Sequence, residues 1–257
     1  MMNEEKIGLI AAMPSESAAL LRLFRGRKRI RIGSLPGAGF QRGGRECILV
    51  TSGMGTRRAA EAARILIETA HPSCLISFGI AGAVREDLNI GDVVLAMKNY
   101  TFEGGSLSAP RPLAPLSGGA RAAVAQVLRP FDARLFAGSA VTTREAQLGP
   151  QSSPQLENPV LEMETAGILQ AAAPGGIPLV VLRSVSDGPQ SPIPFDLETV
   201  MDDDYKLRPA AMLKAILKHP EILLQSGRMA RNSRVAADNA ARAVLAVLDQ
   251  PASFLQS

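Results

Sequence analysis

Short apolar runs alternate along the chain with longer segments in which apolar residues recur at helical spacing. The runs expected to be strands cover 6–12, 30–33, 47–51, 74–78, 92–97, 134–142, 160–163 and 179–185. The segments expected to be helices cover 17–24, 56–70, 120–128, 165–172 and, interrupted by Pro209 and Pro220, 207–248. This alternation predicts one α/β domain with a mainly parallel or mixed sheet and helices on its faces.

Glycine, proline and serine mark the connections between these elements. We expect turns at 52–55 and 79–83, and a long loop at 101–119 of the kind that forms a lid or a subunit contact. Ser15 is expected to cap the first helix, which places Glu16 in its first turn. We divide the chain into an α/β domain at 1–205 and a C-terminal helical extension at 206–257, packed on the same domain.

Composition narrows the function classes. The 257 residues are 46% apolar, enough for a sizeable core, and the net charge is a modest +4 with 4% aromatics and no tryptophan, which does not favour nucleic-acid binding. Cys47 and Cys74 lie in apolar surroundings and are expected to be reduced core thiols. Because no apolar run is long enough to span a membrane and the N-terminus lacks a signal pattern, we expect a cytoplasmic protein. His71 and His219 form no cluster with cysteine, so no metal is expected.

Acidic residues follow three of the predicted strands directly. Glu16 follows the first strand, Glu162 and Glu164 surround the end of the strand at 160–163, and Asp187 follows the strand at 179–185. In open α/β sheets ligands bind beyond the carboxyl ends of the strands, so we expect these acids to converge. Several carboxyl groups suit cleavage of a glycosidic bond, since they can stabilise an oxocarbenium-like sugar and protonate the leaving group.

Each of these residues also has a purely structural interpretation. The helix dipole favours a glutamate in a first helical turn, and an aspartate beside Gly-Pro is common in turns. We expect only one of Glu162 and Glu164 to face inward, with the other in solvent. The glycines at 53–55 and 79–82 fit phosphate or sugar binding and tight turns equally well, and the dinucleotide-binding pattern GxGxxG is absent.

Four motifs, in this order, resemble the nucleoside phosphorylase and nucleosidase superfamily over 6–188. They are IGLIAAMPSE at 7–16, SGMG at 52–55, FGIAGAVREDLNIGDVVL at 78–95, and VLEMETAGI at 160–168 with LRSVSD at 182–187. The chain is most similar to the branch containing 5′-methylthioadenosine/S-adenosylhomocysteine nucleosidase. The resemblance implies a three-layer α/β/α fold, a homodimer and cleavage of the N-glycosidic bond of a purine nucleoside.

The resemblance also implies residue roles. Asp187 would be the general acid at purine N7, and Glu16 would orient or deprotonate the attacking water. Glu164 would accept hydrogen bonds from the ribose hydroxyls, and Met163 would pack against the sugar. The other positions that match substrate contacts are Gly79, Ile80, Ala81, Gly82, Thr142, Thr143, Arg183 and Ser186.

Two positions depart from the family pattern where phosphorylases bind phosphate. Phosphorylases carry an arginine two residues before the central glycine and a hydroxyl just after it, whereas this chain has Ser77 and Ile80. The most similar nucleosidases carry serine where Ile80 stands. If this chain uses inorganic phosphate as a co-substrate, the amides at 53–55 with Arg57 or Arg183 are the alternative ligands. The sequence leaves hydrolysis and phosphorolysis both open.

The region beyond Asp187 is longer than in compact nucleosidases and resembles the tail of hopanoid-associated phosphorylase-like proteins. Its basic residues lie among apolar ones at roughly helical spacing: Lys206, Arg208, Lys214, Lys218, Arg228, Arg231 and Arg234. This pattern is typical of helices that touch an anionic membrane surface, and also of a helix that packs on the core with a solvated basic face.

We therefore expect an enzyme that releases the base from an adenine nucleoside, such as methylthioadenosine, S-adenosylhomocysteine or an adenosyl-hopanoid. The alternatives are phosphorolysis, which yields ribose 1-phosphate, and a non-catalytic nucleoside-binding protein, which the apolar Ile80 suggests. Fold alone does not decide among them. The presence of Glu16, Glu164 and Asp187 together favours an enzyme, because a binding protein needs no acid for the leaving group.

Overall fold

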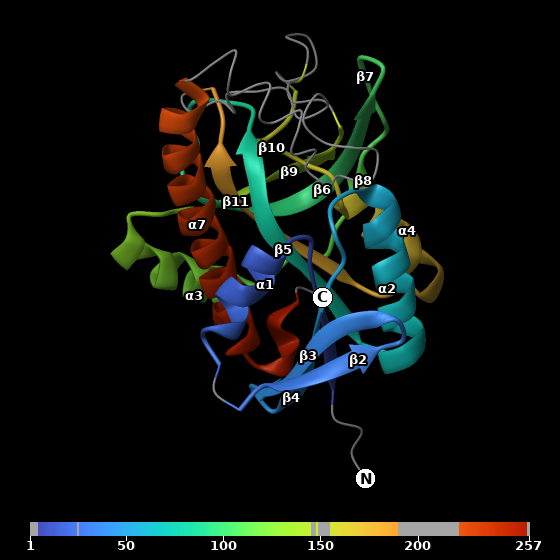
Figure 1. Ribbon diagram of the computed structural model, residues 1–257. Helices are drawn as coiled ribbons and strands as arrows, with labels where there is room; N and C mark the ends of the chain where they lie inside the picture. The colour runs from blue at the N-terminus through green and yellow to red at the C-terminus, as the bar shows by residue number, and fades with distance from the viewer. Residues whose placement is uncertain (1–4, 25, 145–147, 149–154, 190–220, 256–257) are drawn as a thin grey trace.

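A twisted mixed sheet organises the computed structural model, which describes residues 5–24, 26–144, 148, 155–189 and 221–255 (Figure 1). Its strands are β1 (Lys6–Ala11), β2 (Lys28–Ile32), β3 (Leu35–Arg42), β4 (Arg45–Thr51), β5 (Cys74–Ala83), β6 (Val93–Glu103), β7 (Ser106–Leu107), β8 (Arg111–Pro112), β9 (Leu135–Thr142), β10 (Pro159–Glu162) and β11 (Leu179–Asp187). The order is β10-β9-β6-β11-β5-β1-β4-β3-β2, and β7 and β8 pair with β6. Parallel pairs such as β1–β5 and antiparallel pairs such as β6–β11 occur together, which confirms the predicted mixed sheet.

The sheet also closes on itself at one end. Strand β10 pairs in parallel with β9 and antiparallel with β5, so β5, β11, β6, β9 and β10 form a ring. The ring brings β10 next to the carboxyl end of β5, where Leu161 is paired with Gly82. Residues that follow β10 therefore meet residues that follow β1 and β11, although β10 runs opposite to those strands.

Helices cover both faces of the sheet and complete the predicted three-layer α/β/α arrangement (Figure 1). Helices α1 (Pro14–Leu21), α3 (Gly118–Leu128) and α7 (Glu221–Leu248) share one apolar core with the sheet, and α2 (Thr56–Ala70) and α4 (Thr165–Ala172) share a second core on the other face. Short 3₁₀ turns follow α3, α4 and α7. The bounds of α2 and α4 coincide with the predicted ones.

Helix α7 packs on the sheet with its C-terminal half. Ala237, Ala240, Val244 and Leu248 are buried in the core that α7 shares with α1 and α3. The predicted helical stretch at 207–220, with Pro209 and Pro220, and the predicted domain boundary at 205/206 lie outside the described residues. None of the helices in the described part of the chain is long and apolar enough to cross a membrane.

Four local predictions were wrong. The segment at 79–83 is the end of β5 rather than a turn, and the expected loop at 101–119 holds the end of β6, all of β7 and β8 and the start of α3. Strand β3 was missed because Pro36 and its neighbouring glycines are typical of loops. Helix α1 begins at Pro14, so its N-cap is Met13 rather than Ser15, because proline fits the first helical position.

The two cysteines lie in the core, as predicted. Both Cys47 and Cys74 are buried and free of any disulfide, and burial raises the pKa of each thiol to about 12. These thiols stay protonated at neutral pH and are packing groups rather than nucleophiles.

Candidate active site around strand β5

Glu16 reaches strand β5 from the first turn of α1. Its carboxylate accepts the Met13 amide at 2.8 Å, which caps the helix, and the Ile80 amide at 2.9 Å, which ties it to β5. A Cβ at position 79 would overlap the Glu16 carboxylate, so Gly79 leaves the space that this side chain fills. Burial raises the pKa of Glu16, although the two amides and Arg183 partly offset it. A carboxylate of raised pKa is suited to accept a proton near neutral pH.

Asp187 approaches the same strand three residues further on. The register between β11 and β5 shifts by one residue between Val185 and Asp187, and this bulge places Asp187 opposite Gly82. A Cβ on Gly82 would lie 2.8 Å from the Asp187 carboxylate, so this glycine also makes room for an acid. The Ser186 hydroxyl donates to Asp187 at 2.6 Å. Burial raises the pKa of Asp187 and favours its protonated form, which the hydrogen bond from Ser186 partly opposes.

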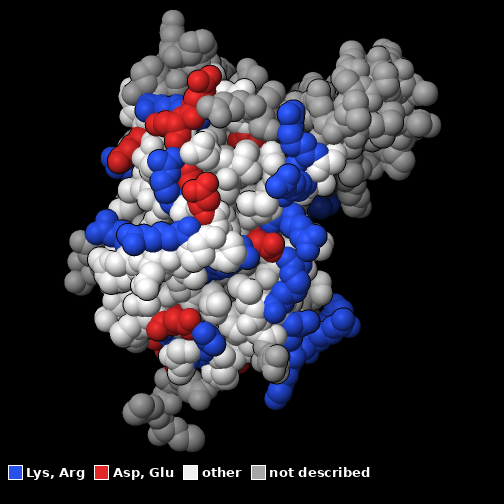
Figure 2. Space-filling model, turned by 90° about the vertical axis from the view of Figure 1, so that its left-hand side faces the viewer, with Lys and Arg blue, Asp and Glu red and all other residues white. Residues whose placement is uncertain are grey.

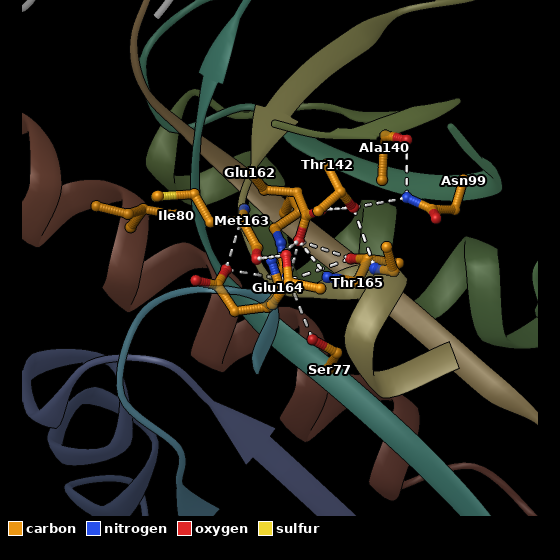
Figure 3. A network of polar contacts seen from close by, with 12 residues as sticks. Ser77, Ile80, Asn99, Ala140, Thr142, Glu162, Met163, Glu164 and Thr165 are labelled. Atoms are coloured by element: carbon orange, nitrogen blue, oxygen red, sulfur yellow. Dashed lines mark hydrogen bonds and ion pairs between the residues drawn. The ribbon is translucent and has the colours of Figure 1, made fainter. Parts of the chain in front are cut away.

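Glu162 is the centre of a buried polar network (Figure 3). Its carboxylate accepts hydrogen bonds from the Thr142 hydroxyl at 2.5 Å, from the amide and hydroxyl of Thr165 at 2.8 and 2.7 Å, from the Glu164 amide at 3.1 Å and from Arg183 at 2.7 Å. Burial alone would raise the pKa of Glu162, but the Arg183 guanidinium and the hydroxyl donors hold it below its ordinary value. Glu162 is therefore a fully paired anion.

Glu164 is also buried, which corrects the expectation that one of these two glutamates lies in solvent. It is the N-cap residue of α4, just beyond the end of β10, and its carboxylate accepts the amides of Gly55 at 3.0 Å and Met163 at 3.4 Å. Gly55 has φ 97°, a conformation that favours glycine, and this conformation turns its amide toward Glu164. Burial and the nearby charge of Glu162 raise the pKa of Glu164 to about 7.

Arg183 belongs to β11, and its side chain lies close to both Glu162 and Glu164. Its guanidinium is 2.7 Å from Glu162 but 3.8 Å from Glu164, and it also donates to the Ser77 hydroxyl at 3.1 Å. Ser77 thus supports this guanidinium from β5. Burial alone would lower the pKa of Arg183, but the two glutamates keep it above its ordinary value, so the group is a permanent cation.

The predicted positions in the threonine segment lie behind this network. The Thr142 hydroxyl donates to Glu162 and accepts from Asn99 at 2.9 Å and from the Ala166 amide at 3.1 Å. These contacts use its hydrogen-bonding capacity and place it at the start of α4. Thr143 is buried next to it, and its amide donates to the carbonyl of Glu162.

The remaining predicted positions surround the carboxyl groups. Ile80 packs, half-buried, on the core beside α1 and α7, and Ala81 is buried between the two glycines of β5. Met163 is half-buried, and its carbonyl accepts the Thr56 hydroxyl at the start of α2. Within the described residues no group of three or more His, Cys, Asp and Glu side chains could hold a metal ion.

The sequence missed the parts of the site that depend on tertiary contacts. The network includes Glu162, Thr165 and Asn99. From the sequence, Glu162 was considered only as the alternative to Glu164, and Thr165 and Asn99 were not considered. The position of Glu162 at the end of a short strand was the one available signal. Its pairing with Arg183, 21 residues away along the chain, was not predicted.

Comparisons with known proteins show which family the chain belongs to. The sequence profile described as Phosphorylase superfamily matches residues 6–218. A 5′-methylthioadenosine/S-adenosylhomocysteine nucleosidase of Shewanella halifaxensis is 31% identical over 233 residues, covering 83% of this chain and 99% of the relative. The same-named protein of Haemophilus influenzae (strain 86-028NP) is 29% identical over 199 residues, covering 71% of this chain and 86% of the relative.

Solved structures share the fold. The 5′-methylthioadenosine/S-adenosylhomocysteine nucleosidase of Neisseria meningitidis, in complex with methylthio-immucillin-A, has a TM-score of 0.68 at 20% identity, covering 95% of this chain and 99% of that one. The nucleosidase of the same name from Colwellia psychrerythraea, in complex with adenine, has a TM-score of 0.69 at 22% identity, covering 98% and 97%. Futalosine hydrolase of Helicobacter pylori has a TM-score of 0.65 at 18% identity, covering 94% and 96%.

Proposed function

Because the chain belongs to the phosphorylase superfamily, we propose that it hydrolyses the N-glycosidic bond of an adenine nucleoside and releases free adenine. The observation that carries this proposal is the placement of two acids against one strand, the buried Glu16 at Gly79 and the half-buried Asp187 at Gly82. Three strand residues span about 10 Å, which is enough for a nucleoside to lie between an acid at the leaving base and a base at the attacking water.

The reaction requires one proton transfer at each end of the nucleoside. Asp187, whose protonated form is favoured because burial raises its pKa, donates its proton to N7 of the adenine, so that the electrons of the C1′–N9 bond leave with a neutral base. Glu16 takes a proton from a water whose oxygen forms the new bond to C1′. The products are adenine and the free sugar, and the proton now on Glu16 returns to Asp187 through solvent.

The sugar would be held by the residues next to Glu164. Within the part of the chain that the structure describes, the Glu164 carboxylate has two amide donors, so it keeps lone pairs for the ribose hydroxyls. Met163 would pack against the ribose. One side of the nucleoside would be lined by Gly79, Ile80, Ala81 and Gly82. Ser186 would orient the acid Asp187. Thr142 and Thr143 would support the purine side from behind.

Charge favours hydrolysis over phosphorolysis. Three carboxyl groups, those of Glu16, Glu162 and Glu164, surround one guanidinium, so the local charge disfavours an incoming phosphate dianion. Several of the ligands considered for phosphate are already engaged, because Arg183 pairs with Glu162, the Gly55 amide donates to Glu164 and the Gly53 amide donates to the Ala12 carbonyl. Ser77, at the position of a phosphate-binding arginine, accepts a hydrogen bond from Arg183 instead.

The named relatives suggest a 5′-thio-substituted adenosine as substrate. The Shewanella halifaxensis nucleosidase is matched over 99% of its length but over only 83% of this chain, so part of this chain has no counterpart in that match. We therefore include in the proposal a bulkier 5′ group, such as that of an adenosyl-hopanoid. S-adenosylhomocysteine and methylthioadenosine are the first substrates to test.

Adenine release decides the reaction class. The purified protein is incubated with methylthioadenosine, S-adenosylhomocysteine, adenosine and a 5′-alkyl adenosine, each with and without inorganic phosphate. Turnover without phosphate and a free sugar product support hydrolysis. Strict phosphate dependence with a sugar 1-phosphate product identifies a phosphorylase, and no adenine from any substrate supports a binding protein.

The variant Asp187→Asn tests the role of the acid. Asparagine keeps the size of the side chain but cannot protonate the base, so we expect kcat to fall by about 10²- to 10⁴-fold while substrate affinity is largely kept. Isothermal titration of the variant with methylthioadenosine measures that affinity. Unchanged turnover in Asp187→Asn contradicts the assignment.

We further propose a cytoplasmic homodimer with a membrane-facing basic edge. Figure 2, which views the α7 side, shows lysine and arginine side chains along one margin, and Arg228, Arg231 and Arg234 of α7 are exposed. The exposed arm of β7 and β8 is a candidate subunit contact. Sedimentation equilibrium tests the dimer, and co-sedimentation with vesicles containing anionic lipid, compared with neutral vesicles, tests the basic edge. A monomer contradicts the proposed homodimer, and equal binding to anionic and neutral vesicles contradicts the membrane-facing basic edge.

A further inference from the structure

Glu162 and Glu164 are two residues apart, yet their carboxylates have different surroundings. Glu162 accepts five hydrogen bonds from protein groups, and these donors reach both of its carboxylate oxygens. Among the described residues, Glu164 accepts two hydrogen bonds, from the amides of Gly55 and Met163. One carboxylate is therefore saturated by the fold, whereas its neighbour keeps capacity for a ligand.

The guanidinium of Arg183 interacts with the carboxylates of both Glu162 and Glu164. Arg183 is 2.7 Å from Glu162 and 3.8 Å from Glu164, so its hydrogen bond goes to Glu162 and only a longer-range attraction reaches Glu164. All three side chains are buried, so this preference is not weakened by solvent. If Glu162 lost its charge, Glu164 would be the nearest carboxylate to which Arg183 could turn.

Glu162 also fixes the backbone that carries Glu164. Its carboxylate accepts the first amides of α4, those of Glu164 and Thr165, and thereby caps the helix. Glu164 has no side-chain cap hydrogen bond of its own at that helix end. The direction in which Glu164 points therefore depends on Glu162.

We propose that Glu162 is a positioning residue, which holds Arg183 and the start of α4 so that the Glu164 carboxylate stays available to the sugar hydroxyls. This inference rests on the proposed nucleosidase function. We assign Glu162 no contact with the substrate or the reacting atoms, because its buried carboxylate already accepts five hydrogen bonds from protein groups. Its effect reaches the reaction through Arg183 and Glu164.

The charges around Glu164 make the arrangement measurable. Glu162 on β10 and Glu16 on α1 raise the pKa of Glu164, and Arg183 on β11 and the Gly55 amide before α2 lower it. In Glu162→Gln one anion is removed and the guanidinium is released toward Glu164. Both changes act in the same direction, so the pKa of Glu164 should fall below its wild-type value of about 7.

The test follows the titration of Glu164 by carboxyl ¹³C NMR in the full chain, with the signal assigned by its loss in Glu164→Gln. We expect Glu162→Gln to lower the titration midpoint and to reduce kcat/KM for adenine release by about 10- to 100-fold, mainly through KM. Glutamine keeps an acceptor for the α4 amides, so the variant should fold, and circular dichroism checks this.

Two further variants separate positioning from structure. Thr165→Val removes one hydroxyl donor but keeps the charge of Glu162, so the Glu164 midpoint should stay near 7. Glu162→Asp also keeps the charge and should restore a midpoint above that of Glu162→Gln. An unchanged midpoint in folded Glu162→Gln, or equal midpoints in the Asp and Gln variants, overturns the proposal. A wild type that releases no adenine overturns the proposed function instead, and the titration still decides the role of Glu162.

Discussion

Replacing Gly167 by alanine tests whether the close packing of α2 against α4 sets the geometry of the site. A Cβ at this position would overlap the carbonyl oxygen of Thr56 and would lie 3.0 Å from the Thr56 carbonyl carbon and 3.1 Å from the Ala60 amide nitrogen. All three atoms belong to the backbone of α2 and cannot rotate away. The two helices must therefore separate by about 1 Å to restore ordinary contact distances.

Two opposing contributions set the stability change in Gly167→Ala. Overpacking against backbone costs about 1–3 kcal/mol, and alanine recovers up to about 1 kcal/mol because it favours a helix more than glycine does. We expect a net loss of about 1–2 kcal/mol in the free energy of unfolding, measured by urea titration. A chain of this size should then lose roughly 2–8 °C in Tm.

The same separation should reach the active site. Gly55 precedes α2 and donates to Glu164, the N-cap of α4, at 3.0 Å. A shift of about 1 Å would lengthen this contact beyond hydrogen-bonding distance, and kcat/KM for adenine release should fall by up to about 100-fold. Gly119→Ala in α3 is the matched control, because nothing lies within 4 Å of the added Cβ. Equal stability and equal kcat/KM in the two variants would refute the reasoning.

Three further predictions address charge and space. The pKa of Glu164 is raised to about 7, so its contribution to the free energy of unfolding is present below about pH 4.3 and is lost as the pH rises through 7. Between these two pH values the wild type should lose about 3 kcal/mol of stability relative to Glu164→Gln. Urea unfolding of both proteins at each pH measures this difference. Arg45→Met should cost about 2–4 kcal/mol of stability, because the buried guanidinium donates to three carbonyl groups at the end of α7. The control Arg42→Met removes an exposed ion pair and should cost at most about 1 kcal/mol. Equal losses of the two variants in thermal unfolding would contradict this prediction. Gly82→Ala should displace Asp187 and lower kcat more than it raises KM; a normal kcat would show that the acid tolerates the methyl group.

Helices were predicted well where the local signals agreed. For α2, apolar spacing, an uninterrupted run of helix-forming residues and the glycines before it all indicated the same bounds, and the structure has Thr56–Ala70 as expected. Helix α1 was displaced by three residues, because Ser15 is a good N-cap by type while Pro14 fits the first helical turn by its backbone. The proline decided, since its ring presets the helical φ.

Strand β5 shows why the site could be located but not built from sequence. Its glycines at 79 and 82 were interpreted as a turn, because glycine is unfavourable within a strand. The structure gives the reason for them, which is the close approach of Glu16 and Asp187. No local rule states which distant side chain will occupy the space of a missing Cβ.

The acids converge for a reason that the sequence rule did not contain. The prediction placed them at the carboxyl ends of parallel strands, yet β10 runs opposite to β5. Glu162 and Glu164 reach the site because β10 is short and lies beside the carboxyl end of β5, where the sheet closes into a ring. Strand direction is fixed by pairing across the whole sheet, and a single short run carries no signal of it.

The burial of Glu16 and Asp187 depends on the absence of a side chain at positions 79 and 82 of β5. Alanine at positions 79 and 82 would make a more stable strand by about 0.5–1 kcal/mol each, but its methyl groups would occupy the space that Glu16 and Asp187 now fill. Displaced carboxyl groups would be more exposed to water, and their pKa values would return toward the ordinary range. The proposed acid would then be ionised at neutral pH and could not protonate a leaving base. The glycines of β5 thus lower the stability of the strand and raise the pKa of the groups that the proposed reaction needs.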